Sequence, residues 1–381
     1  MSEPCVSPAQ VVFTARSSGH SESEIATALA TQLPWVHCSA VLFFCSTDYD
    51  LARLGTAMFA AFPDTQLIGC TTAGEITPNG YERGSVCAIG FHQDWFQVNA
   101  TLLQDLADFD LPKAQVLLEE LLQDAGDAPA SEQFVLTLFD GLSSQEEQVL
   151  ALFDSVLGRI AHFGGSAGDD IRLATTHVFY QGAFYSDAAV FVWLKTPLPF
   201  AVFSTHHLTQ PGTKLVVTAA ESATRTVYEL NAMPAAQSYA DLLGCSVSEL
   251  TPAVFALNPL AVKMGDQFYV RSIQRVNEDL SLTFYCAIGQ GMVLTAMQGE
   301  AILPNLERTL AELERRLGAP MVTLGCDCFL RRLELEHFDQ ADRASQLLQH
   351  YRVLGFNTYG EHFDGVHINQ TFTGVYIGQP K

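Results

Sequence analysis

Two adjacent histidines, His206 and His207, follow a run of apolar and aromatic residues, FAVFST, that is typical of a buried strand. Successive side chains of a strand point to opposite faces, so one of the two imidazoles is expected to point inward. An imidazole at the end of an apolar, phenylalanine-containing strand is suited to hold the iron of a haem group as an axial ligand. The alternative for each residue is an ordinary histidine that is hydrogen-bonded inside the protein or exposed to solvent.

A second group of polar side chains lies near the C-terminus, in the stretch GVHINQTF at residues 365–372. Strand alternation places His367 and Asn369 on one face together with Thr371, and apolar side chains on the other face. Three polar groups on one face indicate either solvent or a polar ligand pocket, and the sequence leaves both open. His367 is accordingly the reserve candidate for the haem ligand.

Three stretches of the chain follow one plan, in which an apolar strand, a polar turn, a helix and a glycine-containing loop succeed one another. Each loop ends in a glycine and a carboxylate, and the carboxylates are Glu75, Asp169 and Glu361. Strand–helix–strand units place such loops at the carboxyl ends of strands, where α/β proteins commonly bind ligands. We therefore expect the three carboxylates to line a shared ligand pocket. The alternative is that the loop residues only form turns, with help from a hydroxyl two residues before each glycine.

An enzyme is the least supported interpretation of the same motifs. The sequence GGSAG around Ser166 matches the nucleophile elbow of esterases, but DDIRLATT follows it, which is a poor helix where the elbow requires one. Cys326 belongs to the sequence CDC, and no second pair of cysteines is spaced to complete a tetrahedral metal site. A hydrolase that uses Ser166 or Cys326 therefore remains an alternative without an identified base.

The periodicity of apolar residues predicts an α/β fold, in which mixed β-sheets are covered by helices and built from repeated strand–helix–strand units. A polar stretch near residue 225 predicts two domains, residues 1–225 and 226–381. Strands are expected at residues 40–46, 66–70, 85–91, 96–103, 134–140, 183–194, 200–208, 266–276, 280–289 and 321–326. Helices are expected at residues 50–62, 112–126, 145–158, 234–244, 301–318 and 344–355.

Charge and cysteine content limit the classes of partner. The 381 residues include 42 acidic and 20 basic ones, which gives a net charge of −22. Such a field repels phosphate backbones and anionic lipid surfaces, so neither nucleic acid nor a membrane is expected as a partner. The N-terminal sequence lacks the pattern of a secretory signal, and nine scattered cysteines fit a reducing cytoplasm.

Several long motifs closely resemble the FIST family of sensory proteins. They are VLFFCSTDYDL, FPDTQLIGCTTAGEITPNGY, FGGSAGDD and LGFNTYGEHFDGVHINQTFTGVYIG. The resemblance covers most of the chain and implies an N-terminal and a C-terminal FIST domain. It also implies a protein that senses small ligands for signal transduction rather than an enzyme.

The chain is most similar to stand-alone FIST proteins, among which are the haem-binding nitric-oxide-sensing proteins called NosP. That similarity implies a non-covalent haem b held by His206 or His207, with nitric oxide as the sensed ligand. The implied partner is a sensor histidine kinase or an enzyme of cyclic-di-GMP turnover. Such a partner implies a role in biofilm control. The similarity also allows a homodimer.

The second hypothesis is a haem-free sensor of an amino-acid-like metabolite. The site would then be lined by Glu75, Asp169, Glu361, His367 and Asn369. Carboxylates and amides of this kind suit an amino group or hydroxyls on the ligand.

Overall fold

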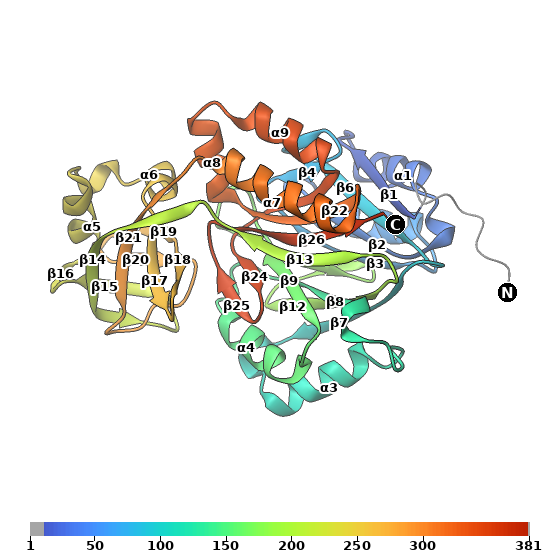
Figure 1. Cartoon of the computed structure of the whole chain (residues 1–381), viewed down its shortest axis with the longest axis horizontal. Coiled ribbons are helices and arrows are strands. Elements are labelled where there is room, and N and C mark those ends of the chain that lie inside the picture. The colour runs from blue at the N-terminus through green and yellow to red at the C-terminus, as the bar shows by residue number, and fades with distance from the viewer. Residues whose placement is uncertain (1–10, 380–381) are drawn as a thin grey trace.

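The computed structural model describes residues 11–379 of the chain. It contains a large body of three mixed β-sheets covered by helices and, at one end of this body, a smaller subdomain built on further strands (Figure 1). The predicted α/β class with mixed sheets is confirmed. None of the helices within residues 11–379 combines the length and the apolar character that crossing a bilayer requires.

The first unit of the body spans residues 12–92. Strands β2 and β3 pair in parallel through helix α2, and β6 pairs antiparallel with the other side of β2. Almost every residue of β2 is buried, which explains its nearly unbroken apolar sequence. The elements of this unit are β1 (Val12–Ser17), α1 (Glu22–Gln32), β2 (Cys38–Cys45), α2 (Leu51–Ala61), β3 (Gln66–Thr71), β4 (Glu75–Thr77), β5 (Gly80–Glu82) and β6 (Val86–His92).

The second unit repeats this order within residues 97–195. Strands β8 and β9 pair in parallel through α4, and β12 pairs antiparallel with β8. The stretch 183–194, predicted as one strand, forms two, because the chain turns at Asp187 with a positive φ of 49°. The elements are β7 (Gln97–Gln104), α3 (Leu111–Leu121), β8 (Gln133–Phe139), α4 (Glu146–Leu157), β9 (Ala161–Ser166), β10 (Val178–Tyr180), β11 (Ala183–Tyr185) and β12 (Ala188–Lys195).

The third unit has the same order but receives an insertion after its first strand. Strands β22 and β23 pair in parallel through α8 and α9, and β26 lies between β22 and β13. The sequence prediction missed α8. The elements are β13 (Phe200–Thr205), α7 (Ile302–Leu317), β22 (Pro320–Cys328), α8 (Phe329–His337), α9 (Ala341–His350), β23 (Val353–Thr358), β24 (Glu361–Phe363), β25 (Val366–Ile368) and β26 (Phe372–Gly378).

Each unit donates a short β-hairpin to the sheet of another unit. The hairpin β10–β11 of the second unit pairs with β3 of the first, and β24–β25 of the third pairs with β9 of the second. The hairpin β4–β5 of the first unit closes the cycle by pairing with β23 of the third. All three sheets therefore have the same strand order, and the units form a closed ring with a three-fold repeat of topology.

The three sheets share one apolar core. Side chains from all three units form a single buried cluster, in which Phe44 of β2 stacks on Phe356 of β23 with ring centroids 4.7 Å apart. The helices cover the outer faces of the sheets and form separate clusters with them. Because the central cluster is shared, one unit alone could not bury the inner face of its sheet.

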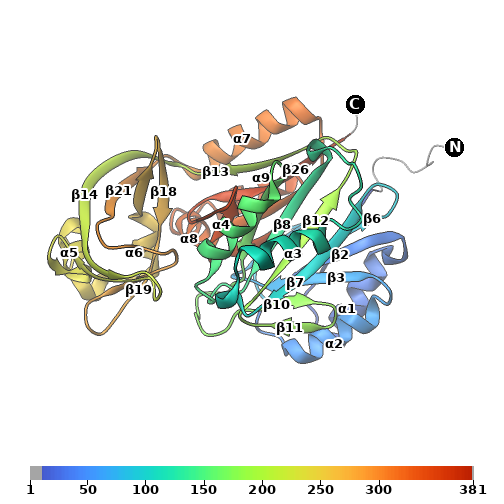
Figure 2. The same cartoon turned by 90° about the horizontal axis from the view of Figure 1, so that it is seen from below.

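The insertion, here called the β-subdomain, comprises residues 208–299. Its strands form a curled antiparallel sheet with a core of its own, seen beside the body in Figure 1 and, from below, in Figure 2. The predicted strand pair around residues 277–279 is present as β19 and β20. The elements are β14 (Leu208–Glu221), β15 (Thr226–Leu230), β16 (Met233–Pro234), α5 (Ala235–Leu243), α6 (Pro252–Leu257), β17 (Leu260–Met264), β18 (Gln267–Arg271), β19 (Ile273–Val276), β20 (Leu282–Phe284) and β21 (Val293–Gly299).

The domain division expected at residue 225 falls in the turn between β14 and β15, inside the β-subdomain. The chain runs from the body into the β-subdomain at residues 206–207 and returns at residues 300–301. The division into residues 1–225 and 226–381 stays a prediction.

Candidate functional site

The three glycine-containing loops meet inside the body and bind one another through backbone hydrogen bonds. We call residues 71–75, 166–169 and 357–361 the loop hub. The bonds that join its loops run from the N–H of Ala73 to the carbonyl of Asn357 (2.9 Å), from Gly168 to Thr71 (3.1 Å) and from Ser166 to Gly360 (2.8 Å). The loops thus satisfy one another's buried backbone groups.

Glycine is required in the hub for close packing between loops. A Cβ atom on Gly168 would lie 2.6 Å from the backbone nitrogen of Ala73, and one on Gly360 would lie 1.9 Å from Nε2 of His367. Neither glycine has a positive φ. The observed reason for glycine at these two positions is therefore contact with the chain itself.

Glu75, the carboxyl group of the first loop, is fully buried and is satisfied by the chain. Its Oε1 accepts a hydrogen bond from the Thr72 hydroxyl at 2.5 Å, and its Oε2 accepts from the N–H and the hydroxyl of Ser85 at 3.0 and 2.7 Å. Burial disfavours the ionised form, the hydrogen bonds offset only part of this cost, and the pKa of Glu75 is raised to about 7.

Glu361 repeats this arrangement in the third loop. Its Oε1 accepts a hydrogen bond from Thr358, and its Oε2 accepts from the N–H and the hydroxyl of Thr371 at 3.0 and 2.8 Å. Burial raises the pKa of Glu361 to about 7 as well. The equivalence of the two carboxyl groups extends the repeat from the sequence to individual hydrogen bonds.

Asp169 in the second loop has a different set of partners. It accepts hydrogen bonds from the backbone N–H groups of Leu173, Ala174 and Thr175 (2.9, 2.7 and 2.9 Å) and from the hydroxyl of Tyr359. All three predicted carboxylates therefore lie in the loop hub, buried and hydrogen-bonded within the chain. Their predicted contact with a ligand stays a prediction.

The polar strand face that follows the third loop holds the β-subdomain against the body. The carbonyl of His367 accepts a hydrogen bond from Arg271 at 2.9 Å, and Oδ1 of Asn369 accepts one from the N–H of Ser272 at 3.0 Å. These polar groups are buried against another part of the chain, and the expectation that His367 and Asn369 also contact a ligand stays a prediction.

The imidazole of His367 lies in the same interface. Its Nδ1 is 3.1 Å from Oε1 of Glu147, whose other oxygen accepts a hydrogen bond from Arg225 at 2.6 Å. Burial opposes a charge on His367, but Cys286 and Glu147 outweigh it and raise its pKa to about 10. The same interactions hold the pKa of Glu147 well below its usual range despite burial.

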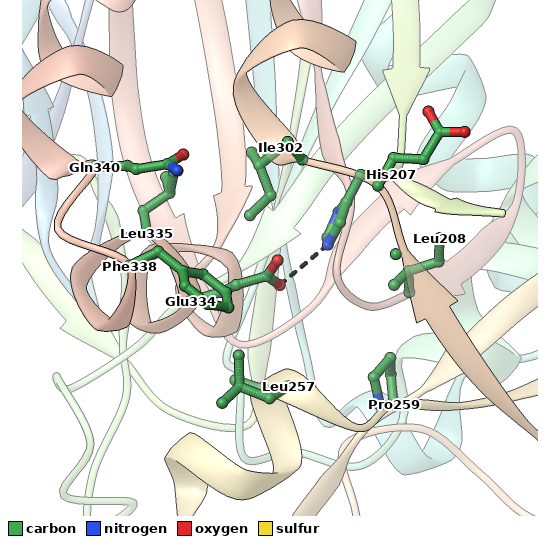
Figure 3. Close-up of a pocket in the computed structure, with 13 residues that line it drawn as sticks. His207, Leu208, Leu257, Pro259, Ile302, Glu334, Leu335, Phe338 and Gln340 are labelled. Atoms are coloured by element: carbon green, nitrogen blue, oxygen red, sulfur yellow. Dashed lines mark hydrogen bonds and ion pairs between the residues drawn. The ribbon is translucent and has the colours of Figure 1, made fainter. Parts of the chain in front are cut away.

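A cavity of about 330 Å³, here called the hinge cavity, lies between the β-subdomain and the body (Figure 3). Both connections between them form its wall, since His207 and Leu208 come from the first and residues 299–302 from the second. Helix α8 adds Glu334 and Leu335, the residue after its end adds Phe338, and further apolar side chains complete the lining. Of the predicted site residues, only His207 lines this cavity.

His207 is held in one tautomer. Arg331 lies with Nη1 3.3 Å from Nδ1 of His207, and a guanidinium group can only donate hydrogen bonds. Nδ1 must therefore be the acceptor, so that the proton lies on Nε2 and is donated to Oε2 of Glu334 at 3.0 Å. His207 is thus a neutral imidazole whose two nitrogens are both occupied.

These contacts do not fit a haem group in the hinge cavity. An iron atom would need a free lone pair, but the lone pair of His207 faces Arg331 and its other nitrogen carries the proton. Among the residues that line the cavity there is no lysine or arginine to bind the haem carboxylates. His206, the other predicted ligand, is half-buried, its Nδ1 has no hydrogen-bond partner and burial lowers its pKa, but it does not line this cavity.

The hydrolytic alternatives lie in the interior. The hydroxyl of Ser166 is 3.1 Å from Nε2 of His362 and 3.2 Å from Oε1 of Glu146, and all three side chains are completely buried. Burial also raises the pKa of Cys326, which keeps it a thiol rather than a nucleophilic thiolate. A buried serine and a protonated thiol give no support to hydrolysis.

Sequence comparison decides the family. The sequence model of the FIST N domain matches residues 39–233, and that of the FIST C domain matches residues 235–364. The chain belongs to the FIST family. FIST domains are sensory domains of signal transduction that bind ligands rather than act as enzymes. No curated protein matches this FIST chain. The FIST N match includes the first strands of the β-subdomain, and the FIST C match begins at α5.

The sequence did not point to the side chains that make the hinge cavity of this FIST protein polar. Glu334, which lines the cavity, and Arg331, which contacts His207 but does not line the cavity, both lie on the unpredicted helix α8, directly after the buried strand β22. The stretch FLRRLELEH does place apolar residues at helical spacing among its charges. That signal identifies a helix, although it does not indicate which glutamate faces a cavity.

The close packing of the loop hub predicts a large effect of the substitution Gly168→Ala. The added methyl group would meet the Ala73 backbone, so we expect a loss of about 1–3 kcal/mol in the free energy of unfolding, measured in urea. Gly289→Ala is the matched control, because its methyl group would have no neighbour closer than 3.6 Å. Equal stability of the Gly168→Ala protein and the wild type would contradict the observed packing.

The buried carboxyl groups of the hub predict a pH dependence of stability. Glu361 titrates near 7 when folded but near its ordinary 4.5 when unfolded, so its contribution falls as the pH rises from 4.5 to about 7. Glu361→Gln should make the dependence of unfolding free energy on pH shallower by up to about 1.4 kcal/mol per pH unit in this window. The amide oxygen can still accept from Thr371, while the amide NH₂ group would donate to the Thr358 hydroxyl and so reverse the direction of that hydrogen bond. Exposed Glu119→Gln is the control, and an unchanged slope in Glu361→Gln would refute the assignment.

Proposed function

We propose that this FIST protein senses a small zwitterionic metabolite with an apolar side chain, of the amino-acid type, in the hinge cavity. The observation that carries the proposal is the position of this cavity, whose wall includes both connections to the β-subdomain together with the carboxylate of Glu334. The FIST family supplies the sensory role.

The lining of the cavity is suited to such a ligand. The carboxylates of Glu300 and Glu334 favour an ammonium group, while Leu208, Ile302 and Phe338 offer apolar surface to a side chain. Residues 301–302 at the cavity wall also begin helix α7, whose N-cap residue Ala301 provides no side-chain hydrogen bond. The dipole of this helix end favours the carboxylate of the ligand.

Binding at this place would act directly on the orientation of the β-subdomain. The two connections already touch each other, since the N–H of Glu300 donates to the carbonyl of His207 at 2.8 Å. A ligand that contacts both connections and α8 would bind one orientation of the β-subdomain more tightly than the others. It would therefore increase the population of that orientation. The orientation of the β-subdomain would then be the output that a partner protein reads. A sensor histidine kinase or a cyclic-di-GMP enzyme remains the proposed partner.

Titration with leucine and with two analogues tests the ligand class. We expect leucine to bind and to raise the melting temperature, because it offers both charges and an apolar side chain. An analogue without the carboxylate and one without the amino group should each bind at least about tenfold more weakly, which corresponds to about 1.4 kcal/mol. Isothermal titration calorimetry measures these affinities.

Substitution at Glu334 locates the site. Glu334→Gln keeps an acceptor for His207 but removes the charge, and should weaken leucine binding at least about tenfold. Glu336→Gln, on the same helix but outside the cavity, should bind as the wild type does. No binding of amino acids together with a haem absorption band that shifts with nitric oxide and disappears in His206→Ala or His207→Ala would favour the haem hypothesis instead.

A further inference from the structure

Three metal-ligating side chains from distant parts of the chain meet where the β-subdomain contacts the body. Glu147 belongs to α4, Cys286 follows β20 in the β-subdomain, and His367 belongs to β25. A carboxylate oxygen, the thiol sulfur and an imidazole nitrogen all lie within 4.8 Å of one another. Cys286 and His367 are buried, whereas the side chain of Glu147 is 27% exposed.

This combination of donor atoms is that of a zinc site. Thiolate, imidazole and carboxylate are the protein ligands of Zn²⁺, with bonds of about 2.0–2.3 Å that place neighbouring ligand atoms roughly 3.3–3.7 Å apart. The Nδ1 of His367 and Oε1 of Glu147 are already 3.1 Å apart. Nε2 of His367 lies against Gly360 and has no hydrogen-bond partner among the described residues. Nδ1, which faces Glu147, is therefore the nitrogen that would bind the metal.

We propose that Glu147, Cys286 and His367 form a zinc-binding site that fastens the β-subdomain to the body. Three protein ligands leave the fourth position of a tetrahedral site for a water molecule. The partly exposed Glu147 gives the ion a path from solvent.

The charges around the site suit a cation. The carboxylates of Glu146 and Glu147 both face the guanidinium group of Arg225, each at 2.6 Å. Zn²⁺ takes thiolate and neutral imidazole as ligands, so its binding displaces protons from them and does not bury an uncompensated charge.

Surrounding groups already orient the ligands. Oε1 of Glu147 accepts a hydrogen bond from the N–H of Ala287 at 2.7 Å, and its Oε2 is held by Arg225. Such contacts fix the direction of metal ligands and are a regular part of built metal sites.

Cobalt titration of the full chain tests the proposal without any variant. After treatment with a chelator, the wild type should bind about one Co²⁺, which Zn²⁺ displaces, and show a thiolate-to-cobalt absorption band in the near ultraviolet. The proposal would be overturned if the wild-type protein shows no such band and binds Zn²⁺ no more tightly than a protein without a zinc site does.

Three variants assign the ligands. Cys286→Ser should lose the thiolate band, and His367→Gln and Glu147→Gln should each weaken binding at least about tenfold. Cys245→Ser, a half-buried cysteine of the same subdomain, should keep both the band and the affinity. A band that survives in Cys286→Ser would also overturn the proposal. The result is independent of the hinge cavity, because none of the three ligands lines it.

Discussion

The fold of this FIST protein depends on the ring of backbone hydrogen bonds between three equivalent loops. Each loop ends a strand of its own unit and satisfies polar groups of a neighbour, and each hairpin that follows is added to another unit's sheet. Backbone groups at the centre of an apolar body have no access to water, so they must find partners within the ring. This requirement explains glycine at the points of closest approach, and the burial that accompanies it raises the pKa of the carboxyl group in two of the three loops.

The three units are no longer equivalent, and the differences coincide with the β-subdomain. The second unit has lost the carboxyl arrangement of Glu75 and Glu361, and its helix α4 instead presents Glu146 and Glu147 to Arg225 of the β-subdomain. The third unit carries the insertion itself and a strand face whose polar groups receive it. Both departures from the repeat lie where the β-subdomain contacts the body. The asymmetry of the ring is therefore concentrated at the groups that hold the β-subdomain.

The repeated plan could be predicted from the sequence, because apolar periodicity and the glycine–carboxylate loops depend on local chemistry. The first strand of each parallel pair (β2, β8 and β22) and the helices α2, α4 and α9 were expected, but of the second strands only β3 was. Strand β9 was missed, and the helix expected at 344–355 ends at His350, so that β23 begins where its last turn was predicted. The exchange of hairpins could not be predicted, since three-residue strands carry little periodicity and their partners are chosen by the assembled ring. Likewise, the loops that carry Glu75, Asp169 and Glu361 meet in the hub, whereas the shared ligand pocket expected for their carboxyl groups stays a prediction. The sequence does not distinguish carboxylates that bind a ligand from those already hydrogen-bonded by Ser85 or Thr371. The roles proposed for Glu334 and Cys286 depend on contacts with His207 and His367, which lie more than 80 positions away in the sequence.

A continuous set of polar contacts connects the hinge cavity with the interior of the body. Glu334 accepts the proton of His207, His207 accepts from Arg331, and Arg331 pairs with Asp327 at 2.7 Å. Asp327 in turn accepts the hydroxyl of Tyr81, which lies on the hairpin that the first unit gives to the third. A cationic group placed beside Glu334 would compete for the carboxylate that holds His207. Because the guanidinium of Arg331 is buried and has few alternative partners, it would have to follow His207 or leave it. A cationic ligand group in the hinge cavity would thus act on a helix, α8, that is connected to the exchanged hairpin through Asp327 and Tyr81, so the proposed ligand would affect the β-subdomain and the ring together.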